Sequence, residues 1–449
     1  MKLILISISL LLTACANFQV GIEPSTPPSQ IPSPVVLAAS PIPPTDMRPV
    51  PQATASLPAL PSAATSQAAP YAAGSTETSR PRQPVKIIQT HMLDAQSGWG
   101  VGQVETDLVD HVLFTVDGGQ TWQDRSPRTA QTSAPVDGLT VAAYFFSAEV
   151  AWISYTSRTP SPVQGSQLIW FTTDAGRTWT SSQPLDFGES PQEFYLPSDL
   201  GTLDGKFGWI MVHMGAGMNH DYISIFTTAD AGKTWTRVLD PQTGSQLMSC
   251  RKTGLVFTSS TSGWLVGDCP GLMPSLFLYR TQDGGYTWTP LSLPAPDGQP
   301  ANFFEQANFG CGIRELAFAS PRTALLPVTC TRFQDNTGLA WLYSSTDNGQ
   351  SWVAYSLPLP YDSFKFISPS EGWLLGSSEN QPSHKNQIQH TSDGGRTWLP
   401  VSQVQWQGSI DFVDSQNGWV VATLTDVSGL VRSSDGGKNW QQISPTLEK

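Results

Sequence analysis

From Val85 onwards, short apolar runs alternate with short polar turns, and this pattern recurs to the end of the chain. In the first unit, the runs cover Val85–Met92, Trp99–Gln103, His111–Thr115 and Thr121–Gln123. Runs of this length, bounded by Gly, Asp and Ser, are typical of β-strands and not of amphipathic helices. We therefore expect units of four strands, which we call a, b, c and d in chain order.

Two short signatures mark each unit. An octapeptide, [Ser/Thr]-x-Asp-x-Gly-x-[Thr/Ser/Asn]-Trp, occurs seven times. A small residue followed by Trp precedes six of the seven octapeptides, whereas the fifth unit has Ala324 at this position. Seven units of about 52 residues are each too small to bury a core alone. They predict an all-β, seven-bladed β-propeller with four-stranded blades.

The seven octapeptide aspartates are interpreted as structural turn residues. They are Asp117, Asp174, Asp230, Asp283, Asp347, Asp393 and Asp435. An aspartate accepts hydrogen bonds from N–H groups further along a turn, and glycine adopts the positive φ that such turns require. One active site cannot use seven equivalent carboxylates, so we expect none of them to be catalytic.

The octapeptide resembles the Asp-box, or BNR repeat, of sialidases and related propellers. The pair G-W-x-x-G and T-x-D-G-G-x-T-W is more similar to the photosystem II assembly-factor family, and this similarity covers residues 86–449. It implies a non-enzymatic binding or scaffold module that acts in the assembly of an envelope or photosynthetic complex. The alternative is a sialidase-like glycoside hydrolase or a glycan-binding propeller. Arginines for that alternative lie near the expected recognition face, at Arg158, Arg251, Arg314 and Arg332.

The N-terminus predicts export and a lipid anchor. Residues 3–12 are mostly apolar but too few to span a bilayer, which is typical of a signal peptide. Leu12-Thr13-Ala14-Cys15 resembles the bacterial lipobox, and this resemblance implies that residues 1–14 are removed and that Cys15 is lipidated. Residues 15–85 are rich in Pro, Ala and Ser and predict a disordered tether, and residues 86–449 form the propeller. We expect a lipoprotein on the extracytoplasmic side of a bacterial membrane, in the cell envelope.

Charge narrows the choice of partner. The formal net charge is −12, which disfavours binding to the phosphate backbone of nucleic acids. His213, His220 and Asp221 are close in sequence, but their spacing matches no known metal geometry. We assign no metal, no cofactor and no catalytic residue, and we expect a monomer with a protein or glycan partner.

The recognition face is predicted from the strand order. Both repeated signatures place their turns, a–b and c–d, at one end of the blade, so variable b–c loops and d–a connections occupy the other end. Aromatic and arginine side chains in these segments are candidates for partner binding. They are Tyr155, Arg158, Tyr195, Tyr222, Phe303, Arg332, Tyr361 and Trp406.

Four cysteines follow Cys15, an even number that favours disulfides in an exported chain. Cys250 and Cys269 lie 14 residues before and 5 after Trp264. Cys311 and Cys330 lie 13 residues before and 6 after Ala324, the equivalent position of the next unit. The repeat therefore predicts Cys250–Cys269 and Cys311–Cys330, each across the open end of an a–b hairpin.

Overall fold

The computed structural model describes residues 82–448, apart from residues 106, 129–136, 160–166, 191–192, 270–275, 378–385 and 425–426. The chain divides into two units, Met1–Ser75 and Thr76–Lys449, and the described residues lie in the second. Cys15, the predicted signal peptide and nearly all of the predicted tether lie outside the described residues. Within the described part, no helix has both the length and the apolar character needed to cross a membrane.

The described strands form seven groups, blades 1 to 7. Blade 1 contains β2 (Lys86–Met92), β3 (Gly98–Gln103), β4 (His111–Thr115) and β5 (Thr121–Asp124). Blade 2 contains β6 (Leu139–Phe145), β7 (Ala151–Ser157), β8 (Trp170–Thr172) and β9 (Thr180–Ser181). Blade 3 contains β10 (Leu196–Thr202), β11 (Gly208–Gly217), β12 (His220–Thr228) and β13 (Thr236–Leu239). Blade 4 contains β14 (Arg251–Phe257), β15 (Gly263–Asp268), β16 (Leu276–Thr281) and β17 (Thr289–Pro290).

In blade 5 the first strand is interrupted. This blade contains β18 (Phe309–Ile313), β19 (Ala317–Ser320), β20 (Thr323–Arg332), β21 (Thr337–Ser345) and β22 (Val353–Ser356). Blade 6 contains β23 (Tyr361–Phe366), β24 (Gly372–Ser377), β25 (Asn386–Thr391) and β26 (Leu399–Val404). Blade 7 contains β27 (Gln407–Phe412), β28 (Gly418–Leu424), β29 (Val427–Ser433) and β30 (Gln441–Ile443). Short 3-10 helices occur at η1 (Ser245–Leu247) and η2 (Phe303–Glu305).

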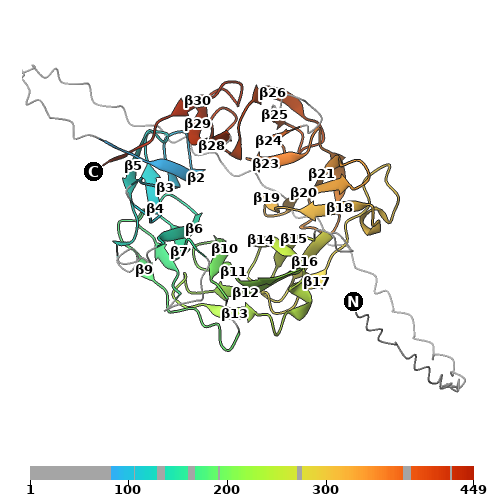
Figure 1. Cartoon of the computed structure of the whole chain (residues 1–449), viewed down its shortest axis with the longest axis horizontal. Coiled ribbons are helices and arrows are strands. Elements are labelled where there is room, and N and C mark those ends of the chain that lie inside the picture. The colour runs from blue at the N-terminus through green and yellow to red at the C-terminus, as the bar shows by residue number, and fades with distance from the viewer. Residues whose placement is uncertain are drawn as a thin grey trace, which may run out of the picture. The chain divides into compact units, whose positions relative to one another are not determined.

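Successive strands of each blade pair antiparallel in chain order, except that β18 and β19 of blade 5 both pair with β20. The blades follow one another around a ring (Figure 1). One bridge, from Asp268 of β15 to Gly312 of β18, joins blades 4 and 5 into a single nine-stranded sheet. The all-β propeller prediction is confirmed.

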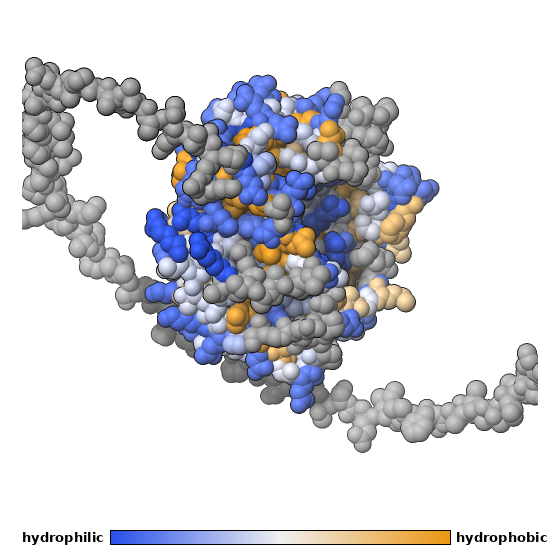
Figure 2. Space-filling model, turned by 60° about the vertical axis from the view of Figure 1, so that its left-hand side comes forward, coloured by the Kyte–Doolittle hydropathy of each residue, from blue (hydrophilic) through white to orange (hydrophobic). Residues whose placement is uncertain are grey.

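The cores lie between neighbouring blades. Among the described residues there are seven hydrophobic clusters, and each combines buried residues of two adjacent blades. The second-signature tryptophans also join blades, because several indole N–H groups donate to a carbonyl of the next blade. These bonds run from Trp99 to Ser147, Trp209 to Leu255, Trp373 to Gly436 and Trp419 to Gly118. The apolar faces of the sheets are thus buried against the neighbouring blades. On the face shown in Figure 2, most of the described residues are hydrophilic. The hydrophobic side chains on this face form small separate groups.

The two ends of the domain meet in blade 1. Strand β31 (Thr446–Glu448) pairs parallel with β5, and β1 (Gln83–Pro84) pairs antiparallel with β31. The Leu447 side chain is buried with Trp122 and Trp419, in the cluster between blades 7 and 1. The ring is therefore closed by an added C-terminal strand, a feature that the sequence repeat does not predict.

All seven octapeptide turns have the same hydrogen bonds. In the first, Thr115 Oγ1 donates to Asp117 Oδ1, and the Thr121 N–H and Oγ1 donate to the same carboxylate at 2.9 and 2.6 Å. In the last, the Asn439 side-chain amide replaces the hydroxyl donor. Hydrogen bonds from the Thr178 side chain and N–H lower the pKa of Asp174 to about 2. A carboxylate in this setting is ionised at neutral pH and occupied as an acceptor.

Each octapeptide turn is also bonded to the a–b turn of its own blade. In blade 1, the Gly118 N–H donates to the Gln96 carbonyl at 2.7 Å, and an equivalent bond occurs in each other blade. In blade 7, it runs from the Gly436 N–H to the Gln416 carbonyl. The a–b and c–d turns therefore share one end of every blade, and the b–c and d–a segments lie at the other end.

Candidate functional site

A pocket of about 710 Å³ lies at the b–c and d–a end of blades 3 and 4. Its walls include the tip of the β11–β12 hairpin, the segment before β14, and Arg314 of blade 5. Met218, at the hairpin tip, is 98% exposed. A second pocket of about 720 Å³ lies beside the ring closure, but its arginine, Arg158, is already paired with Asp110. The first pocket is therefore the candidate site, and we call it the blade 3–4 pocket.

The β11–β12 hairpin is held against the neighbouring blade by backbone bonds. The Asp221 N–H donates to the Met248 carbonyl at 2.8 Å, and the Cys250 N–H donates to the Asn219 carbonyl at 3.0 Å. His220 and Ser249 form an antiparallel bridge at the same place. The hairpin thus continues the sheet of blade 3 onto the chain that enters blade 4. This pairing fixes one wall of the blade 3–4 pocket.

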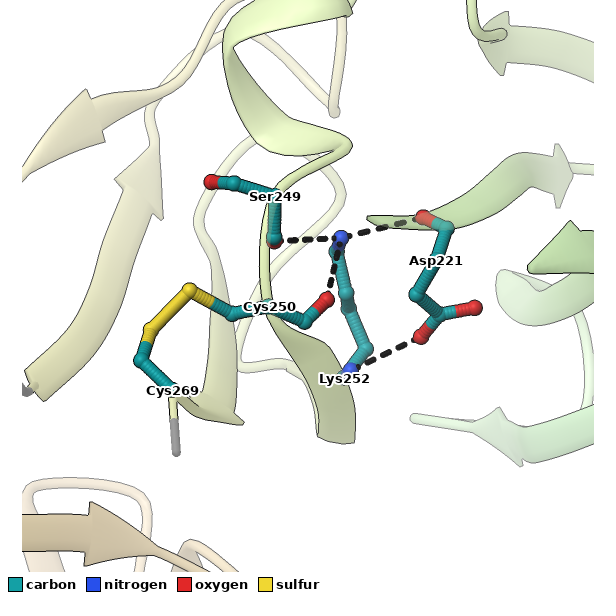
Figure 3. The surroundings of a disulfide bond; sticks show 5 residues. All are labelled: Asp221, Ser249, Cys250, Lys252 and Cys269. Carbon is teal, nitrogen blue, oxygen red and sulfur yellow. Dashed lines mark hydrogen bonds between the residues drawn. A yellow bond between two sulfur atoms is a disulfide. The ribbon is translucent and has the colours of Figure 1, made fainter. Parts of the chain in front are cut away.

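Lys252 lies under this wall (Figure 3). The residue is 4% exposed, and its Nζ donates to the carbonyl oxygens of Asp221, Ser249 and Cys250 at 3.1, 2.9 and 3.0 Å. An ammonium has three N–H donors, so all three are used. Burial lowers the pKa of Lys252 to about 8, although the nearby Asp221 charge opposes this shift. The ammonium therefore crosslinks backbone segments and has no donor left for a ligand.

His213 and Asp221 form a hydrogen-bonded pair beside Lys252. His213 Nδ1 lies 2.8 Å from Asp221 Oδ1, and the Lys252 N–H donates to Asp221 Oδ2 at 2.8 Å. The other ring nitrogen of His213 lies 3.0 Å from Ser198 Oγ. Burial alone would raise the pKa of Asp221, but the hydrogen bond and charge of His213 hold it below the usual value. Both side chains therefore have their polar atoms engaged within the protein.

Both predicted disulfides are present. Cys250–Cys269 joins the residue before β14 to the residue after β15, with the Cα atoms 4.6 Å apart (Figure 3). Cys311–Cys330 joins directly paired residues of β18 and β20. Both pairs lie at the b–c and d–a end of their blades, next to the blade 3–4 pocket. Disulfides are typical of extracytoplasmic proteins.

Three of the predicted surface aromatics are core residues, so this part of the prediction is wrong. Tyr195 is buried between blades 2 and 3, where its hydroxyl lies 2.7 Å from Ser154 Oγ. Phe303 is fully buried between blades 4 and 5. Tyr361 is buried between blades 5 and 6. The d–a connections that carry Tyr195 and Phe303 fold inward onto the sheets, so their aromatic rings complete the cores.

The remaining predicted residues are distributed over several blades. Arg158 is paired with Asp110, and Arg332 lies over the Phe309 ring and 3.3 Å from Asp335. Tyr155 is partly buried against blade 1, and Trp406 packs edge-on against Trp440. Tyr222 is exposed and stacks on His220, whose side chain lines the blade 3–4 pocket. Of the exposed members of the predicted set, Tyr222 lies close to this pocket, and the buried Tyr361 lies near its lining residues Arg314 and Asp268.

The close spacing of His213, His220 and Asp221 does not form a metal site. His213 binds Asp221, whereas the exposed His220 ring stacks on Tyr222 with a centroid distance of 5.8 Å. Among the described residues, no three His, Cys, Asp or Glu side chains are grouped as metal ligands would be.

The fold and the pocket define a β-propeller with a rigid concave site at the b–c end. No family model matches the chain. A xyloglucanase from Paenibacillus sp. is 23% identical over 257 residues, which are 49% of this chain and 24% of that protein. The chain thus spans about a quarter of the length of this curated relative.

Solved structures with a similar course of the chain include YCF48 and a microbial sialidase. YCF48 from Cyanidioschyzon merolae is 16% identical and has a TM-score of 0.42, with 79% of this chain and 96% of that chain covered. The Hadza microbial sialidase Hz136 is 14% identical and has a TM-score of 0.36, with 65% of this chain and 68% of that chain covered.

Proposed function

We propose that the protein is a non-enzymatic binding module that recognises its partner at the b–c end of the propeller, through the blade 3–4 pocket. One observation carries this proposal: the buried titratable groups of the pocket are engaged with one another. Lys252 has no free donor, and His213 and Asp221 are bonded to each other. His213 is also bonded to Ser198 of its own blade, and Asp221 accepts from the Lys252 N–H of blade 4. General acid–base catalysis requires a group that can reach a substrate proton. These groups instead hold the pocket walls in place.

The sialidase-like alternative requires an activated tyrosine nucleophile. The buried Tyr361, the first residue of β23, has the opposite environment, because burial and the nearby Glu315 both raise its pKa. Burial also raises the pKa of Glu315, to about 7, although Arg314 opposes this shift. A tyrosine hydroxyl whose pKa is raised in this way is a weak nucleophile at neutral pH. This arrangement supports binding over hydrolysis.

We further propose that Cys15 carries the lipid anchor and that residues 15–85 connect the propeller to the outer surface of a bacterial membrane. The partner is then a component of the cell envelope, and the role is the assembly of an envelope or photosynthetic complex. The lipobox-like sequence and the two disulfides support this placement.

Site-specific photocrosslinking in intact cells tests the proposal. A photoreactive residue replaces Met218 at the b–c end, or Tyr286 in an octapeptide turn at the opposite end. Both side chains are exposed, at 98% and 59%, so a photoreactive group at either position can reach a partner. We expect an adduct from position 218 that is missing from position 286.

Two results would contradict the proposal. An adduct from position 286 alone would place recognition at the other end of the blades. Release of the fluorophore from a fluorogenic sialoside, abolished in Arg314→Gln, would support the hydrolase instead. The same strains carrying Cys15→Ser provide the control for anchoring, because the variant should leave the membrane fraction. Retention there would show that Cys15 is not the anchor.

A further inference from the structure

We propose that the blade 3–4 pocket binds a carboxylate-bearing saccharide, such as a uronate oligomer, and that Arg251 and Arg314 hold its carboxylate. This inference rests on the proposed binding function and specifies the ligand of the same pocket. Its support comes from strand register, charge, shape and rigidity, which are separate observations.

Strand register places three charged residues in one row. Arg251 of β14 is paired with Asp268 of β15, and Asp268 is paired with Gly312 of β18. Arg314 follows Gly312 by two residues, and alternate residues of an extended chain face the same side. The residues next to this row, Cys250, Cys269, Cys311 and Ile313, are buried. Arg251, Asp268 and Arg314 therefore lie side by side across the junction of blades 4 and 5, and all three line the pocket.

Glycine at position 312 leaves this row open between the two arginines. A Cβ atom at this position would lie 2.6 Å from Asp268 Oδ1, so any larger residue would displace the carboxylate. With glycine there, the Asp268 carboxylate rests over the backbone of β18. The space above it stays open toward the pocket.

The row has an excess of positive charge. Among the residues that line the pocket, two arginines face one aspartate, and Lys252 balances Asp221. The adjacent Glu315 carboxyl also interacts with the charge of Arg314, but burial raises its pKa. Arg251 and Arg314 are exposed, and within the described part of the chain neither takes part in an ion pair. Guanidinium groups bind carboxylates through two parallel N–H···O bonds.

The whole protein has the opposite charge, a formal net −12. The negative charge of the whole protein would repel a densely acidic partner protein, whereas a ligand with well-separated carboxylates avoids most of this repulsion. Repulsion of this kind is screened beyond about 10 Å at 0.1 M salt. A small local excess of positive charge in an acidic protein therefore favours binding of a ligand with well-separated carboxylates over binding of an acidic protein.

The walls of the pocket fit a sugar better than a bare inorganic anion. The volume of about 710 Å³ is within the range of small-ligand sites. Leu196 and Met218 add exposed apolar surface, and the stacked His220 and Tyr222 rings provide a flat aromatic face at the rim. Sugar rings present C–H groups that pack on such faces. A free phosphate or sulfate would use the arginines but none of this surface.

The row is also rigid before any ligand binds. Cys250–Cys269 fixes the residues next to Arg251 and Asp268, and Cys311–Cys330 fixes β18 next to Gly312. Groups that are held in place lose little conformational entropy on binding, which favours a specific small-ligand site.

Titration calorimetry of the full chain with tetragalacturonate tests this inference. The methyl-esterified tetramer keeps the sugar but removes the negative charge, and a tetraglutamate peptide keeps the charge but removes the sugar. Arg251→Gln and Arg314→Gln should each weaken tetragalacturonate binding about tenfold or more, as expected for loss of a charge-assisted hydrogen bond. Arg322→Gln, at the opposite end of blade 5, is the matched control and should change nothing. Asp268→Asn should tighten binding, because it removes the carboxylate that competes for both arginines.

Several outcomes would overturn the inference. These are equal binding of the methyl ester, binding that survives both arginine substitutions, and no tetragalacturonate binding at all. Equal binding of tetraglutamate would show that the pocket recognises carboxylates without the sugar, and would refute the saccharide class. A crosslinked partner at position 218 combined with no tetragalacturonate binding would leave the proposed function standing and reject only this ligand.

Discussion

Removal of residues 446–449 is expected to destabilise the propeller by at least about 3 kcal/mol. The truncation deletes β31, which is the only added strand between β5 and β1 in the described part of the chain. It also removes the Leu447 side chain, which leaves a cavity in the cluster between blades 7 and 1. Loss of a buried leucine alone costs about 2–5 kcal/mol. The Glu448 carboxylate further accepts bonds from the Thr121 and Gln123 side chains at 3.2 and 2.8 Å.

Urea denaturation followed by tryptophan fluorescence measures this effect. Leu447→Ala should reproduce much of the loss. Leu424→Ala is the control, because this leucine is half-exposed and its truncation should change the free energy of unfolding by less than about 0.5 kcal/mol. A truncated protein that unfolds at the same urea concentration as the full chain would show that β31 does not close the ring.

The second large effect is expected for the Cys250→Ala and Cys269→Ala pair, which should lose about 3 kcal/mol of stability. The cysteines are 19 residues apart, and a crosslink over a loop of that size restricts the unfolded chain by about this amount. The replacement also frees the segment that Lys252 and the β11–β12 hairpin hold. Tetragalacturonate affinity should therefore fall along with stability.

The other disulfide provides the matched comparison for this pair. Cys311 and Cys330 are also 19 residues apart, so their replacement by alanine should cost a similar amount in the same denaturation experiment. Cys311–Cys330 braces β18 rather than the hairpin, so its loss should affect tetragalacturonate affinity less. A Cys250 and Cys269 variant with unchanged stability, or with the smaller effect on affinity, would refute this account of the disulfide.

Much of the fold follows from local sequence patterns. The apolar runs of the first unit differ from β2, β3, β4 and β5 by one residue at the most at either end. This agreement arises because the turns between strands have strong chemical signals, namely Asp, Gly and Trp at fixed positions. The disulfides also follow from the repeat, because equivalent positions in two blades have equivalent geometry.

The closure of the ring could not be predicted in this way. Strand β31 is three residues long and has no repeat equivalent, and its parallel partner β5 lies more than 300 residues earlier. The interruption of the first strand of blade 5, between β18 and β19, likewise has no counterpart in the other units. A pattern that is defined by repetition does not predict a feature that occurs in one unit alone.

The candidate site shows a second limit of prediction from the sequence. The sequence identifies aromatic residues in the d–a connections, but it does not show whether a loop folds inward. Tyr195 and Phe303 are buried for that reason. Lys252 was missed because its carbonyl partners at 221, 249 and 250 carry no side-chain signal. Arg251 and Arg314 are 63 positions apart and become neighbours only through the bridge between β15 and β18.

The central claim is that the pocket is formed before any partner binds, and hydrogen–deuterium exchange of the free protein tests it most directly. The decisive amides are those of Asp221, Cys250 and Lys252, which bond to Met248, Asn219 and the Asp221 carboxylate. We expect these three amides to exchange as slowly as the core strand β11. Exchange within seconds, while β11 stays protected, would show that the hairpin and the segment before β14 separate in the free protein, and would contradict the account.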